Sequence, residues 1–125
     1  MTASTSDVLV RAADLISEYG FAQGAFARDE QGRAVSCMSA DAVSFCPLGA
    51  MWRAQKELCA PQTAYHQAVK TLTEQVRKER HPITRKRFRY VAEWSDVQRT
   101  PRAITALIQA AAEEANEASA RMVLA

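Results

Sequence analysis

Cys46 is the side chain best placed for chemistry, because it directly precedes Pro47. Proline is favoured at the first position of a helix, so Cys46 is predicted at or near a helix N-cap. Unsatisfied N–H groups and the helix dipole can lower the pKa of a thiol there, as a nucleophile requires. The candidate bases are His66, His81 and Asp96, and none lies near Cys46 in the sequence. We predict a buried structural thiol, and the alternative is a small enzyme that depends on Cys46, with Asp96 as its other candidate catalytic residue.

Two glycines mark a predicted close junction in the fold. Gly24 follows Gln23 in a short extended run, and Gly49 falls in the first turn of the helix that Pro47 begins. Exposed N–H groups at such a helix start can hold an anion or a carboxylate. Alternatively, the glycines only allow two backbones to approach closely. We favour close packing, because the sequence has no G-x-G-x-x-G or G-x-x-x-x-G-K phosphate-binding motif.

Trp94 lies in the segment Glu93–Asp96, just before the last predicted helix. In one interpretation Trp94 packs in the core and Asp96 accepts backbone N–H groups in a turn. In the other, Trp94 and Asp96 form a pocket together with Gln23 and Cys46. The sequence leaves both interpretations open.

Positive charge is concentrated in one short segment. Residues 77–89 carry seven basic side chains and one acidic side chain, a net +6, whereas residues 1–76 and 90–125 each carry −2. Such a field attracts phosphate, an acidic protein or an anionic surface, although a solvated helix end is equally consistent with it. Aromatic rings alternate with the cations, which suits phosphate contact combined with base stacking. The predicted binding residues are Arg85, Lys86, Arg87, Phe88, Arg89 and Tyr90, together with Gln23 and Trp94.

The cysteines and histidines do not form a recognisable metal or disulfide pattern. Cys37, Cys46 and Cys59 are odd in number, and their spacing matches neither a disulfide framework nor a zinc motif. Reduced thiols are typical of the cytoplasm. We therefore predict a cytoplasmic protein with no metal and no cofactor.

The composition predicts one compact domain over residues 1–125, with 48% apolar and 24% charged residues. No stretch approaches the roughly 18 consecutive apolar residues of a membrane span, and the polar N-terminus does not resemble a signal peptide. We expect residues 1–6 to be disordered and residues 119–125 to fray.

Apolar residues recur at three- and four-residue steps in four segments, which predicts four main helices. The first opens at Ser6-Asp7 and ends at Gly20, and the second begins at Pro47 and ends at Ala60. The third follows Pro61 and ends in the basic residues 77–80. The last opens at Thr100-Pro101 and continues toward the C-terminus.

A β-hairpin is predicted between the first two helices, where the acidic turn 29–32 separates two short runs and Gly32 supplies a positive φ. With Arg28 and Arg33 closing the loop, Phe26 falls opposite Val35. Residues 39–43 are expected to form a helical turn. Residues 81–99 fit neither a strand nor a helix period clearly and are expected to be mostly irregular. The predicted fold is α+β and helix-dominated: four main helices with one small antiparallel β-hairpin.

Six parts of the chain form a recognisable set: Ala12–Ile16, Gly20–Ala25, the turn with Asp29 and Gly32, Cys46–Ala50, Trp94–Asp96 and Arg99-Thr100. Together they resemble a family of small bacterial and phage proteins that is classed only as a domain of unknown function. The resemblance covers roughly residues 8–60 and 90–112, and leaves the basic segment outside. In that family the tryptophan motif more often has Asn where this chain has Ser95, and this difference argues against a role for an amide at this position. The resemblance implies a fold and a set of positions but no activity.

No complete catalytic set emerges from these residues. We therefore predict a non-enzymatic interaction protein, a phage or mobile-element accessory factor that binds a host protein. The first alternative is a nucleic-acid-associated factor that uses residues 77–90. The second alternative is the Cys46-dependent enzyme. No contact with a membrane is expected.

Overall fold

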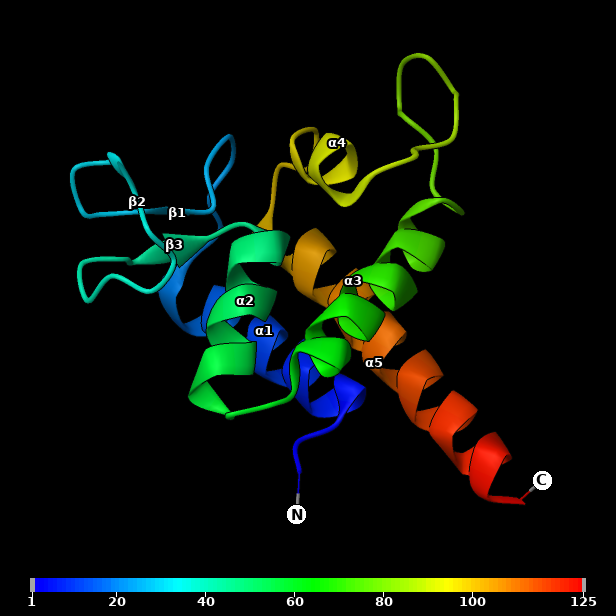
Figure 1. Ribbon diagram of the computed structural model, residues 1–125. Helices are drawn as coiled ribbons and strands as arrows, with labels where there is room; N and C mark the ends of the chain where they lie inside the picture. Colours follow the sequence, from blue (N-terminus) through cyan, green and yellow to red (C-terminus); the bar gives the residue numbers. More distant parts are fainter. Residues whose placement is uncertain (1, 125) are drawn as a thin grey trace.

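Helix α1 (Thr5–Tyr19) is the centre of the molecule, because the other three long helices all pack against it. These are α2 (Pro47–Glu57), α3 (Gln62–Val76) and α5 (Pro101–Leu124). Figure 1 shows α5 running along the bundle and extending past it at its C-terminal end. The computed structural model describes residues 2–124. No helix within this range is both long and apolar enough to cross a bilayer.

A small antiparallel sheet lies at one end of the helices (Figure 1). Its strands are β1 (Ala27–Arg28), β2 (Ala34–Val35) and β3 (Ser44–Phe45), and β1 lies between the other two. The α+β, helix-dominated fold predicted from the sequence is thereby confirmed. The third strand and a short fifth helix, α4 (Val91–Ser95), are additions that the periodicity did not reveal.

The first helix begins earlier than predicted. Ser4, not Ser6, is the N-cap: its hydroxyl accepts the N–H of Asp7, and the Asp7 carboxylate accepts the N–H of Ser4. This reciprocal capping box makes Ser4 the better start. Part of the stretch expected to be disordered is therefore in or beside α1, and α5 includes residues 119–124. Met1 and Ala125 lie outside the described residues.

The hairpin register differs from the predicted one by a residue. Ala27, not Phe26, pairs with Val35. The reason is Asp29, whose carboxylate accepts the backbone N–H groups of Gln31 and Arg33 and so closes the turn one residue later. A one-residue shift exchanges the two faces of a strand. As a result Ala27 is fully buried, while Phe26 is 60% exposed.

Gly49 has the packing role that we favoured for it. A Cβ at this position would overlap the carbonyl oxygen of Phe26. The N–H of Cys46 donates to that same carbonyl at 3.1 Å, so the start of α2 lies directly against the hairpin. Any larger residue at position 49 would push the two segments apart.

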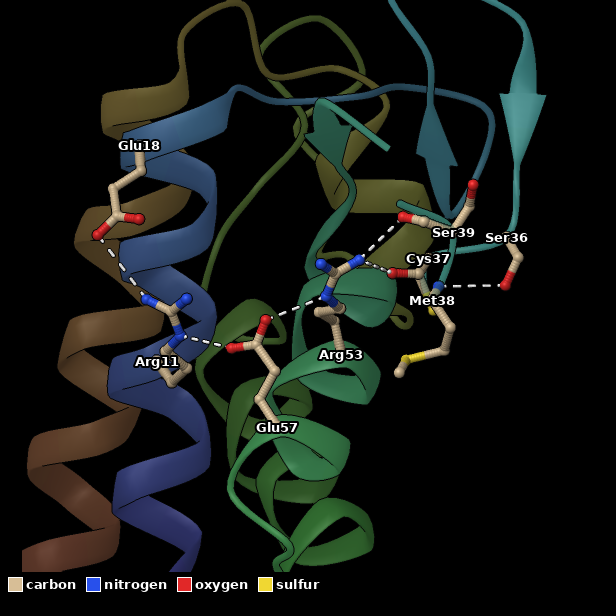
Figure 2. Close-up of polar contacts among 8 residues, drawn as sticks. All are labelled: Arg11, Glu18, Ser36, Cys37, Met38, Ser39, Arg53 and Glu57. Carbon is tan, nitrogen blue, oxygen red and sulfur yellow. Dashed lines mark hydrogen bonds and ion pairs between the residues drawn. The ribbon is translucent and has the colours of Figure 1, made fainter. Parts of the chain in front are cut away.

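A shared carboxylate joins α1 to α2 (Figure 2). Glu57 accepts the Nε–H of Arg11 at 2.8 Å and that of Arg53 at 3.0 Å. Arg53 also donates to the carbonyl oxygens of Cys37 and Ser39, and its guanidinium lies 5.7 Å from the centre of a core phenylalanine ring. Burial alone would raise the pKa of Glu57, but the hydrogen bonds from the two arginines lower it. This network holds the loop before β3 against the helices.

Candidate functional site

A cavity of about 610 Å³ opens between the hairpin, the start of α2 and the end of α4. Phe26 and Val35 line it from the hairpin, Cys46 and Leu48 from α2, and Asp96 from the end of α4. The fold therefore brings Cys46 and Asp96 to one cavity. Gln23 and Trp94, which one interpretation of the sequence grouped with them, do not line it. The walls are mainly apolar, with these two residues and two serines, Ser36 and Ser95, as the polar exceptions.

Cys46 is the N-cap of α2, as predicted from Pro47. Its Sγ accepts the N–H of Gly49 at 3.3 Å. Burial raises the pKa of the thiol, and the N–H groups of Gly49 and Leu48 only partly oppose that effect. These N–H groups are the ones that could activate a thiolate, but the effect of burial on the pKa outweighs theirs.

Neither histidine supplies a base for Cys46. His66 is exposed on α3, with its ring against Tyr65. His81 lies in a different segment, and its Nδ1 accepts the N–H groups of Ile83 and Thr84. A nitrogen that accepts these bonds is not free to take a proton from a thiol. Asp96 is the one predicted base beside the cavity, and it is exposed.

Trp94 and Gln23 have structural contacts. Trp94 is 2% exposed and belongs to the hydrophobic core, as in the first interpretation above. The Gln23 amide nitrogen lies 2.6 Å from the carbonyl oxygen of Gln98 and 3.1 Å from that of Asp96. Gln23 thus connects the hairpin to the turn after α4, and its donor group is already engaged.

The basic loop, which we define as residues 77–90, projects beyond the ends of α3 and α4 (Figure 1). It is folded back on itself: Arg80 and Arg87 form an antiparallel bridge, flanked by bonds from His81 N to Lys86 O and from Phe88 N to Glu79 O. The sequence suggested irregular structure here. The bridge is too short to produce a visible period.

All seven basic side chains of the loop are exposed. Five ion pairs form among the described residues: Arg11 with Glu18, Arg11 with Glu57, Arg33 with Asp29, Arg53 with Glu57 and Arg121 with Glu114. None of the seven basic residues of the loop takes part in one. Their charge is therefore uncompensated by the part of the chain that the structure describes.

The two aromatic residues of the loop differ. Phe88 is 3% exposed and packs in the core. Its ring is therefore not accessible to a partner, and the prediction that Phe88 is a binding residue is corrected. The antiparallel bridge turns Phe88 toward the body of the protein, where its ring lies 5.8 Å from that of His81. Tyr90 is 63% exposed and remains available. Ile83, which the sequence analysis did not single out, is 84% exposed at the tip of the loop.

Arg77 and Arg80, which were not among the predicted binding residues, bond to the backbone of the same loop. Arg77 donates its Nε–H to the carbonyl oxygen of Arg89 at 3.3 Å, and Arg80 donates from Nη1 to that of Arg85 at 3.0 Å. The bond from Arg77 to Arg89 joins the two ends of the loop, and the bond from Arg80 to Arg85 lies within it. The charge count already included both arginines, but only the bridge shows which basic residues lie side by side.

No group of three or more His, Cys, Asp or Glu side chains within residues 2–124 has the geometry to hold a metal ion. In comparisons with known proteins, a family model described as "Family of unknown function (DUF6197)" matches residues 1–114. This match includes the basic loop, which the resemblance found in the sequence had left outside. No curated protein and no solved structure matches the chain.

Proposed function

We propose that this chain, which belongs to the DUF6197 family of unknown function, is a non-enzymatic binding protein whose basic loop contacts an acidic surface of a protein partner. The observation that carries the proposal is the set of seven exposed basic side chains without an ion pair among the described residues. Uncompensated charge on a projecting loop steers association with an oppositely charged partner.

Two features favour a protein over a nucleic acid as the partner. Phe88 is buried, so one of the two rings that stacking on bases would use is not accessible. Ile83 stands exposed at the tip of the loop, where it gives the cations an apolar neighbour. An apolar side chain among cations suits a protein surface, which offers apolar contacts that a phosphate backbone lacks.

The protonation state of Cys46 supports this non-enzymatic role. The raised pKa of the thiol keeps it protonated near neutral pH, and a protonated thiol is a poor nucleophile. The proposal also includes a cytoplasmic location and a role as an accessory factor acting on a host protein. The three free thiols support that location, because reducing compartments preserve them.

The experiment is affinity capture from a nuclease-treated lysate of the source organism, with elution by increasing salt. The loop variant R85A/R87A/R89A is compared with a control, K70A/R102A/R121A, which removes the same charge from exposed positions on α3 and α5. We expect the wild type and the control to retain the same protein and the loop variant to lose it. Equal retention by all three proteins would contradict the proposal.

Direct binding measurements exclude or establish the nucleic-acid alternative. DNA and RNA oligonucleotides of mixed sequence, about 20 nucleotides long, are titrated at about 0.15 M salt. At this ionic strength, interactions between exposed charges are screened beyond roughly 8 Å. We expect dissociation constants weaker than about 10 µM for single and double strands, in the range of non-specific binding. Submicromolar affinity that disappears in the loop variant would overturn the proposal in favour of nucleic acid.

A further inference from the structure

Arg80 and Arg87 lie directly opposite each other in the basic loop. The bonds that flank them, from His81 N to Lys86 O and from Phe88 N to Glu79 O, make them a non-hydrogen-bonded antiparallel pair. In such pairs the Cα atoms are only about 4.5 Å apart, and both side chains leave the same face of the ribbon. The two guanidinium groups therefore start from adjacent points.

The neighbouring residues show which face this is. Phe88, next to Arg87, points to the other side of the ribbon and is buried in the core. His81, next to Arg80, is half-buried and in ring contact with Phe88. Successive side chains alternate between the faces of an extended strand, so the arginine pair faces away from the body of the protein. Both arginines are exposed.

Like charges directly opposite each other destabilise a pair of strands. In this loop no carboxylate of the described residues forms an ion pair with either arginine. The loop nevertheless adopts this arrangement, because the turn and the buried Phe88 determine it. An anion bound between the two side chains would remove the repulsion.

The turn that presents the pair is held in place by several bonds. The Nδ1 atom of His81 accepts the N–H groups of Ile83 and Thr84, and the carbonyl oxygen of His81 accepts the N–H of Arg85 at 3.0 Å. Arg85 has a φ of 64°, a left-handed conformation that is uncommon for residues other than glycine. Arg80 donates from Nη1 to the Arg85 carbonyl oxygen, which orients its guanidinium and leaves its other donors free.

We propose that the Arg80–Arg87 pair is a binding site for a phosphomonoester dianion, supplied by a phosphorylated side chain of the partner. This inference rests on the proposed function and names the acidic group that the loop recognises. A phosphomonoester carries a charge close to −2 and three acceptor oxygens, so it can neutralise two guanidiniums and accept a fork from each. A single carboxylate has one negative charge and two oxygens, so it can neutralise and bind only one guanidinium.

The test is an NMR titration of the full chain with O-phospho-L-serine, with succinate as the dianion that lacks a phosphate. Backbone amide resonances of residues 79–81 and 83–88 report binding in every variant. We expect O-phosphoserine to bind about tenfold or more tightly than succinate. A single phosphoryl group accepts both arginine forks at one point, whereas the two charges of succinate lie on separate carboxylates that each accept one fork. Equal affinities for the two dianions would overturn the proposal.

Two double variants separate the arginine fork from charge alone. R80K/R87K keeps the charge but removes the planar fork, so the preference for O-phosphoserine should fall below about twofold. K78Q/K86Q removes two cations of the same loop and leaves the pair intact, so both ligands should weaken alike and the preference should remain. A preference that survives in R80K/R87K would contradict a site built by this pair.

Inorganic phosphate distinguishes the source of the phosphoryl group. Inorganic phosphate that binds tenfold or more tightly than O-phosphoserine would assign the site to the free ion and overturn a phosphorylated partner. The titration needs no partner protein, so its result is independent of the capture experiment. Loop-dependent capture without selectivity for O-phosphoserine would contradict only the phosphate site. Selectivity without loop-dependent capture would contradict the proposed function.

Discussion

Arg11 and Arg53 in the helical body differ from Arg80 and Arg87 in the basic loop in what compensates their charge. The first two share Glu57, and Arg53 also donates to two backbone carbonyl oxygens (Figure 2). The second two face each other across a bridge and form no ion pair with any described residue. The arginines of the body thus serve the fold, and those of the loop are available to a partner.

The same contrast extends to uncharged groups. In the body, the Cys46 thiol accepts the N–H of Gly49, and the Gln23 amide donates to backbone carbonyl oxygens. No buried side-chain nitrogen or oxygen among residues 2–124 lacks a hydrogen-bond partner. Buried polar side chains of the body are therefore engaged within the chain, so removing one should lower stability. Loop side chains should affect binding instead.

The largest expected effect is at Trp94. Its side chain is 2% exposed and lies in the core beside the base of the loop, so Trp94→Ala should lower the free energy of unfolding by about 3–5 kcal/mol. Urea denaturation measures the change. The matched control is Tyr90→Ala in the basic loop, which should change stability by less than about 0.5 kcal/mol because Tyr90 is exposed. An unchanged unfolding midpoint for Trp94→Ala would place Trp94 on the surface. The difference in stability effects between the helical body and the basic loop would then not hold.

A smaller effect is expected at Glu57. Hydrogen bonds to charged groups contribute about 1.5–3 kcal/mol when buried, but Glu57 is partly exposed, so Glu57→Ala should cost only about 1–2 kcal/mol. Thermal and urea denaturation give the value. Glu117→Ala, at an exposed position of α5, controls for the loss of a carboxylate and should be within about 0.5 kcal/mol of wild type. If both variants lost the same stability, the shared carboxylate would not be what joins α1 to α2.

The smallest effect on stability is expected for the loop arginines. In R80Q/R87Q a like-charge pair is removed, so the free energy of unfolding should stay unchanged or rise by up to about 0.5 kcal/mol. Arg53→Gln is the comparison in the body, and it should lower stability because two carbonyl oxygens and Glu57 lose a donor. A loss of more than about 1 kcal/mol in R80Q/R87Q would show that the pair serves the fold.

Local signals were sufficient for most of the helical framework. Pro47 after Cys46 predicted the start of α2, and Thr100-Pro101 predicted the start of α5, because caps and first-turn prolines act over a few residues. The hairpin was predicted, but its register was not. The register depends on whether the Asp29 carboxylate bonds within its own turn, which is a choice among competing local hydrogen bonds.

The sequence predicted the basic segment and a set of binding residues in it, but not how these residues are arranged. Arg80 and Arg87 are seven residues apart, and nothing in the residue types between them indicates a turn with a left-handed residue at Arg85, where glycine or asparagine would be usual. Alternation with aromatic residues suggested that Phe88 and Tyr90 are equivalent. Packing against the body buries one and leaves the other exposed.

By itself the sequence determined the helix-dominated class, the cap at Cys46 and the concentration of charge between residues 77 and 89. These properties follow from composition and from interactions between residues a few positions apart. Only the tertiary structure decided that Arg80 lies opposite Arg87 and that the pair faces outward. The physical reason is that burial of Phe88 against distant segments of the chain sets the orientation of the loop, and such contacts have no local signature in the sequence.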